Sequence, residues 1–137
     1  MNTYVLDACA LIAVLQDEAG SDKVTSVINM AYIGKAIVLM NKVNLLEVYY
    51  DVYRLRGKEQ AEIILFEMKK IPVTVISDFS DDIFHEAGRI KATYKISVAD
   101  AFALAQASVT EGFLLTADHH EFDIIEKKDR IKFDWIR

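Results

Sequence analysis

The stretch Ala36-Ile37-Val38-Leu39-Met40-Asn41 decides the fold, because it is a continuous apolar run that ends at a residue suited to cap a helix. A strand that is apolar at every position is typical of a parallel sheet whose two faces are both covered. Asn41 is a favourable N-cap for the amphipathic segment Lys42 to Arg56, which Gly57 ends. The stretch therefore predicts a buried strand that leads directly into a helix.

The same alternation of short apolar strands and helices extends in both directions along the chain. Further strands are expected at residues 4–6, 73–76, 113–116 and 131–136, and further helices at 8–15, 21–33, 58–70, 81–94 and from 97 to the glycine at 112. Ser21, Ser80 and Ser97 are expected as N-caps, and residues 119–129 as a turn and a short helix. The pattern predicts an α/β fold, a three-layer α/β/α sandwich with a central, mainly parallel sheet of four to five strands in the order 3-2-1-4-5.

The composition suits one domain that spans residues 1–137, with 53% hydrophobic residues to form its core. Cys9 is the only cysteine, which excludes a disulfide within the chain and a zinc cage built on cysteines. No apolar run approaches the roughly 20 residues of a membrane-spanning helix. The first four residues lack the basic start of a signal peptide, so we expect a cytoplasmic protein.

The net charge of −5 argues against a nucleic-acid partner held on a broad basic face. This objection weakens if several acids converge on one site, where a metal ion neutralises them. Two acids stand where such a site is expected. Asp7 follows the first strand directly, and Asp118 lies just beyond the fourth. Ligands of open α/β sheets bind beyond the carboxyl ends of strands, at the point where the strand order reverses, so neighbouring first and fourth strands would bring both carboxylates together.

Asp100 and Glu47 each have two interpretations. Asp100 lies in an apolar helix start, and Ser97 to Asp100 also fits a capping box, so its carboxylate is a cap, a site residue or both. Glu47 is either an ordinary surface residue or the border of a buried face, and no Lys or Arg stands one turn away to balance it. Four separated carboxylates with no Cys or His at ligand spacing suit Mg²⁺ or Mn²⁺ and not zinc. Such ions activate water for attack on a phosphodiester.

Four stretches of the chain carry a family pattern. They are Tyr4-Val5-Leu6-Asp7-Ala8-Cys9-Ala10-Leu11-Ile12, Asn44-Leu45-Leu46-Glu47-Val48, Ser97-Val98-Ala99-Asp100-Ala101-Phe102-Ala103-Leu104-Ala105 and Leu114-Leu115-Thr116-Ala117-Asp118-His119-His120-Glu121-Phe122-Asp123. In order, spacing and chain length they resemble PIN domains, in particular the VapC toxins of bacterial and archaeal toxin–antitoxin pairs. The resemblance covers essentially the whole chain.

The resemblance implies a Mg²⁺- or Mn²⁺-dependent endoribonuclease, a toxin that inhibits translation and growth. It implies catalytic and metal-binding roles for Asp7, Glu47, Asp100 and Asp118, and supporting roles for Thr116 and Asp123. It also implies a homodimer and a cognate antitoxin. One departure is Ala8-Cys9, because many relatives carry a hydroxyl residue after the first Asp. The departure implies weaker support of the Asp7 carboxylate by neighbouring side chains.

Alternative interpretations remain open. One is a catalytically silent PIN-like module that binds RNA or protein. Another is a phosphoryl-transfer domain of the receiver or haloacid-dehalogenase type, which the lack of a second acid next to Asp7 disfavours. Adjacent His119 and His120 suggest a general base, although solvated histidines in a turn are more common. Candidates for binding RNA phosphates are Arg89, Lys91 and Lys95, with Lys127, Lys128 and Arg130 as a second group. The apolar residues of 42–56 and 58–70 are either core or a dimer face and partner groove.

Overall fold

The structure, a computed structural model, describes residues 1–137 and contains one five-stranded sheet. All neighbouring strands are parallel, and their order is β3-β2-β1-β4-β5. The strands are β1 (Asn2–Leu6), β2 (Ala36–Asn41), β3 (Thr74–Ile76), β4 (Phe113–Thr116) and β5 (Lys132–Trp135). The order expected from the sequence is confirmed, and β1 and β4 are neighbours at the centre of the sheet.

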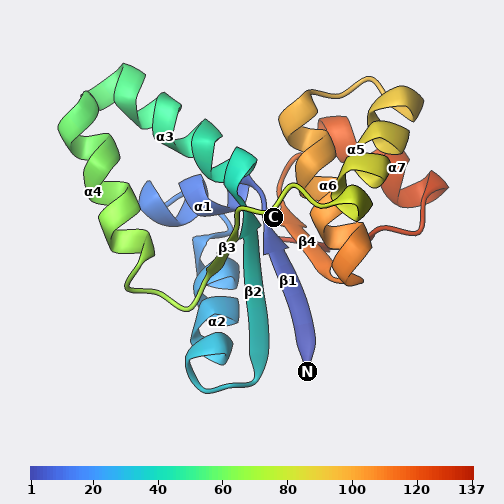
Figure 1. Cartoon of the computed structure of the whole chain (residues 1–137). Helices are drawn as coiled ribbons and strands as arrows, with labels where there is room; N and C mark the ends of the chain where they lie inside the picture. The colour runs from blue at the N-terminus through green and yellow to red at the C-terminus, as the bar shows by residue number, and fades with distance from the viewer.

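Seven helices cover the two faces of this sheet (Figure 1). They are α1 (Ala8–Leu15), α2 (Ser21–Tyr32), α3 (Lys42–Arg56), α4 (Lys58–Met68), α5 (Asp81–Thr93), α6 (Val98–Thr110) and α7 (His119–Lys128). Helices α1 to α4 pack on one face and α5 to α7 on the other. Alternate side chains of β1 point to opposite faces of the sheet. Tyr4 and Leu6 therefore pack in the core under α1 to α4, and Val5 packs in the core under α5 to α7.

Helices α3 and α4 form a hairpin that extends away from the sheet (Figure 1). Gly57 joins them with a φ of 91°, a conformation that costs a glycine little and a residue with a Cβ much more. Asn41 caps α3 as expected, since its side chain accepts a hydrogen bond from the Val43 backbone N–H at 2.9 Å. The decisive stretch 36–41 therefore forms the strand and the helix start that its pattern predicts.

Two details differ from the sequence expectations. Ser21 is not an N-cap: it is the first residue of α2, and Gly20 stands before it at a φ of 97° without a side-chain cap. Gly20 is required there because a Cβ would lie 2.8 Å from the backbone oxygen of Ile136. Helix α7 extends over 10 residues, more than a short turn of helix. None of the helices combines the length and the hydropathy that crossing a membrane requires.

Candidate active site

Asp7 lies at the carboxyl end of β1, where the strand leads into α1. Its carboxylate caps α1 by accepting a hydrogen bond from the Ala10 N–H at 2.8 Å, and only 5% of the residue is exposed. Burial raises the pKa of Asp7 to about 7, and the nearby charges of Asp100 and Asp118 add to the increase. Hydrogen bonds from the Thr116 hydroxyl and from Ala10 oppose it. The folded chain therefore holds this carboxylate where a negative charge is costly.

Thr116 and Asp118 stand at the end of β4, next to Asp7. Register pairs Leu6 with Leu115, so the two strand ends meet at the same edge of the sheet. Thr116 is fully buried, and its Oγ1 accepts from the Asp118 backbone N–H at 3.1 Å while its hydroxyl bonds to Asp7. Asp118 caps α7 by accepting from the backbone N–H of Glu121 at 3.2 Å. One threonine thus connects the backbone of Asp118 to the carboxylate of Asp7.

Asp100 lies in the capped first turn of α6, near other acids. The Ser97 hydroxyl caps α6 by accepting from the Asp100 N–H at 3.0 Å, as a capping box requires. Burial raises the pKa of the Asp100 carboxyl, the charges of Asp118 and Glu121 raise it further, and hydrogen bonds from Ser97 oppose the increase. The cap therefore orients a carboxylate that also faces the other acids of the site.

Glu47 reaches the same region from α3. The residue is partly buried, and burial raises its pKa, with further increases from the charges of Asp100 and Asp51. Asn44, one turn earlier, is 1% exposed and donates from Nδ2 to the backbone oxygen of Ala99 at 3.0 Å and to Glu47 Oε1 at 3.5 Å. Its Oδ1 is buried and has no hydrogen-bond partner. No role was predicted for Asn44 from the sequence, although an Asn on the buried face of a helix, one turn before an acid, indicates a residue that can position that acid.

The four carboxylates come from four different elements and fit the donor set of a hard divalent cation. Oxygen ligands from carboxylates suit Mg²⁺ or Mn²⁺, and a cation would relieve the cost of charging the buried Asp7. The side chains do not form a ready cage, since no three Asp, Glu, His or Cys residues lie close enough to hold an ion together. Electrostatic repulsion between the carboxylates keeps them apart when no cation is bound. The unpartnered Asn44 Oδ1 provides a further buried oxygen beside Glu47.

The two histidines after Asp118 are both exposed, but His119 also has contacts with other residues of the fold. His119 Nδ1 lies 2.8 Å from Asp123 Oδ1, and its Nε2 lies 2.8 Å from the backbone oxygen of Arg137. The ring also stacks on Trp135, with centroids 3.8 Å apart, and Trp135 stacks in turn on Phe133. Both ring nitrogens of His119 are therefore engaged although 47% of its side chain is exposed, whereas 93% of the His120 side chain is exposed. Asp123 pairs with His119 through Oδ1.

The expected RNA-binding cations occupy different surroundings. Arg89 is already paired with two carboxylates, through Nε to Glu86 at 2.6 Å and through Nη1 to Asp129 at 3.0 Å. Lys91 and Lys95 are exposed, and neither forms an ion pair. The charge of Arg89 is therefore largely balanced within the fold, and the two lysines keep theirs available.

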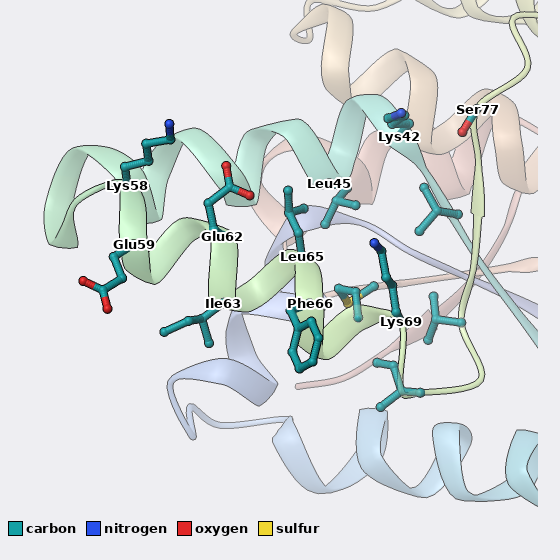
Figure 2. A pocket seen from close by; sticks show the side chains of 14 residues that line it. Lys42, Leu45, Lys58, Glu59, Glu62, Ile63, Leu65, Phe66, Lys69 and Ser77 are labelled. Carbon is teal, nitrogen blue, oxygen red and sulfur yellow. The ribbon is translucent and has the colours of Figure 1, made fainter.

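A cavity of about 1130 Å³ forms a groove between α4 and the edge strand β3, and none of the four site carboxylates lines it. Figure 2 shows Ile63, Leu65 and Phe66 of α4 among its lining side chains, with Lys58 and Glu59 at one end and Lys42 and Ser77 at the other. Phe66 is 60% exposed and Ile63 is 43% exposed. The apolar excess that the sequence shows in this hairpin therefore lies partly on the surface.

Comparisons with known proteins agree with this fold. Among solved structures, a chain of the VapBC-1 complex from nontypeable Haemophilus influenzae is similar over 98% of each chain, with a TM-score of 0.74 and 16% identity. VapBC2 from Rickettsia felis, bound to a DNA fragment from its promoter, has a TM-score of 0.77 and 18% identity over 97% of this chain and 98% of that one. The Mycobacterium tuberculosis toxin VapC20, described as cleaving the sarcin-ricin loop, has a TM-score of 0.60 and 15% identity over 80% and 84%.

These identities establish a shared fold and nothing finer. No curated protein sequence shows significant similarity to the chain. The sequence profile of the PIN domain, by contrast, matches residues 4–128, a range that contains all four carboxylates. The chain belongs to the PIN domain family.

Proposed function

We propose that the protein is a metal-dependent endoribonuclease that hydrolyses RNA phosphodiester bonds. The observation that carries the proposal is the buried carboxylate of Asp7, whose pKa is about 7, with the charges of Asp100 and Asp118 close enough to raise it. A fold gains no stability from a buried acid set against other acids, so a functional cation is the better reason for the arrangement. A similar fold in VapC20, a toxin described as cleaving the sarcin-ricin loop, supports RNA as the substrate.

Asp7, Glu47, Asp100 and Asp118 are the residues that would hold Mg²⁺ or Mn²⁺. Such an ion, when bound, lowers the pKa of a coordinated water and stabilises negative charge on a phosphodiester. Thr116 fixes Asp118 relative to Asp7, and Ser97 orients Asp100. Asp123 acts indirectly, because its carboxylate contacts the ring of His119, the residue that follows Asp118 in the chain.

We further propose that the chain is the VapC-type toxin of a toxin–antitoxin pair that inhibits translation in the cytoplasm. The VapBC complexes with the same fold support a cognate antitoxin, and the groove beside α4 is the site we assign to it. Leu46, Tyr50 and Tyr53 form an exposed stripe at helical spacing on α3. This stripe is the face we assign to a homodimer.

Incubation of the purified chain with single-stranded RNA tests the nuclease. Cleavage is expected with Mn²⁺ or Mg²⁺ and is expected to stop with EDTA. Asp7→Asn and Asp100→Asn should each abolish it, whereas Asp22→Asn, an exposed acid of α2, should cleave like the wild type. Binding of RNA without cleavage under every metal condition would instead favour the silent binding module.

A further inference from the structure

A second cleft, of about 570 Å³, opens between helix α7 and the segment that joins α5 to α6. Tyr94 and Lys95 line one wall, and His120, Glu121 and Lys128 line the other. Its volume falls within the range of about 300–1,000 Å³ that is usual for ligand sites. It is separate from the groove beside α4, with which it shares no lining residue.

Both walls of this cleft lead to the candidate active site. On one side, the lining residue Ile96 is followed by Ser97, whose hydroxyl caps the helix of Asp100. On the other side, Glu121 donates its backbone N–H to Asp118 at 3.2 Å. An extended ligand in the cleft would therefore reach the carboxylates of Asp100 and Asp118 along either wall.

The cleft is locally positive on an acidic protein. Lys95 and Lys128 are exposed and take part in no ion pair, and Glu121 is the only acid that lines the cleft. The nearest contact between a base and an acid there is 3.9 Å, from His120 to Glu121. The whole chain, by contrast, has a net charge of −5. Two lysines without partners in one cleft favour an anionic ligand over a cationic one.

Other cations near the sheet lack these properties. Arg89 is bound by Glu86 and Asp129, and Arg130 lines a different pocket with Lys132, which begins β5. In a parallel sheet the strands begin at the edge opposite to their carboxyl ends. The pocket of Arg130 and Lys132 therefore lies on the far side from Asp7 and Asp118.

We propose that the cleft between α7 and residues 93–96 binds the sugar–phosphate backbone of single-stranded RNA and leads it to the carboxylates, which deepens the proposed nuclease function and rests on it. Lys95 and Lys128 contact successive phosphates. Tyr94 and Ile124, which is 50% exposed, offer apolar surface to a ribose or base. The cleft has no pair of arginines that would fix one geometry of the phosphates. It therefore binds the RNA backbone with little preference for sequence.

The test is fluorescence anisotropy with a labelled single-stranded RNA of mixed sequence in EDTA, where no cleavage occurs, over a series of salt concentrations. The double variant Lys95→Gln/Lys128→Gln is compared with Lys35→Gln/Lys132→Gln. In the control pair, Lys35 directly precedes β2 and Lys132 begins β5, so both lie at the opposite edge of the sheet, and their replacement changes the net charge by the same amount. Both pairs are exposed, so both doubles are expected to fold.

The cleft variant should bind RNA about tenfold more weakly, and its slope of log affinity against log salt should fall by about 1.4, at roughly 0.7 per phosphate contact. The control should stay within about twofold of the wild type. Equal losses in both variants, or no loss in the cleft variant, would overturn the proposal. If the wild type cleaves RNA and the cleft variant has the same KM as the wild type, the proposed role of the cleft is wrong and the nuclease function stands. If the wild type binds RNA through the cleft but never cleaves it, the nuclease function is wrong and the role of the cleft stands.

Discussion

Asn44 ties the helix of Glu47 to the helix of Asp100, because its Nδ2 donates to the backbone oxygen of Ala99 at 3.0 Å and lies 3.5 Å from Glu47 Oε1. The amide has only one favourable orientation, since both neighbours are acceptors and a flipped amide would face Ala99 with its own oxygen. The position of the Glu47 carboxylate relative to α6 therefore depends on a buried side chain that carries no charge.

Replacement of Asn44 by Leu should weaken Mn²⁺ binding by about tenfold, the lower end of the effect of residues that orient metal ligands. Stability should also fall by about 1–3 kcal/mol, because the backbone oxygen of Ala99 loses its donor. Gln106→Met is the matched control, since it breaks the buried amide pair of Asn41 and Gln106, 3.1 Å apart, on the same helix as Asp100. The control should lose comparable stability and keep its Mn²⁺ affinity in calorimetry. If both variants bind Mn²⁺ equally well, Asn44 is structural only.

Removal of the Ser97 cap separates the two roles of Asp100. Ser97→Ala should cost about 1 kcal/mol of stability through the lost cap and should also reduce RNA cleavage, because Asp100 loses a partner that orients it. Ser80→Ala removes the equivalent cap of α5, where Ser80 accepts from the Ile83 N–H at 3.3 Å. It should cost similar stability without affecting cleavage. Thermal unfolding and cleavage rates of the two variants decide the question, and equal cleavage in both would make Ser97 a cap and nothing more.

The raised pKa of Asp7 makes the stability of the metal-free protein depend on pH. In the unfolded chain Asp7 ionises near 3.8, the ordinary pKa of an aspartate, whereas in the folded chain it ionises at a pKa of about 7. Between these values the folded state binds more protons, so stability falls as the pH rises from about 4 to 7. Asp7→Asn keeps a good cap for α1 and removes this loss. In EDTA, the variant should melt at a higher temperature than the wild type at pH 8 and at a similar temperature at pH 4. A variant that melts lower at pH 8 would contradict the costly charge.

The groove beside α4 should be required for an antitoxin but not for folding. Ile63→Ser and Phe66→Ser change exposed residues, so their melting temperatures should stay close to that of the wild type, while binding of the cognate antitoxin weakens. Ile33→Ser, which changes an exposed residue at the end of α2, is the matched control and should bind normally. Affinity should also fall with rising Mg²⁺ and in Asp100→Asn, if the antitoxin places a cationic side chain at the carboxylates. Calorimetry in which the affinity is unchanged by Mg²⁺ and by Asp100→Asn would leave blockage of the groove as the only mechanism of inhibition.

Local patterns were sufficient to predict most of the fold. The run 36–41 and the caps Asn41, Ser80 and Ser97 act over a few residues, and each appears as expected. The position of Asp7 and Asp118 followed from topology, because parallel strands bring their carboxyl ends to one edge. Ser21 is not the cap because Gly20 takes that position, where a side chain would meet the backbone of Ile136, which is distant in sequence.

Contacts across the chain account for what the sequence did not reveal. Arg89 is paired with Asp129, 40 residues away, and His119 contacts Arg137 and Trp135. The link from Asn44 to Ala99 spans 55 residues. None of these pairings leaves a periodic or local trace, so residue type and spacing alone do not disclose them.

The stack of His119 on Trp135 gives the protein an optical probe of its own. Trp135 is the only tryptophan, and the imidazole that lies 3.8 Å from it directly follows Asp118 in the chain. Indole emission responds to an imidazole in contact, so any ligand that shifts the start of α7 will change the brightness or colour of that emission. Cation titrations and RNA encounters can therefore be followed in the unlabelled wild type, in real time, by exciting a single residue.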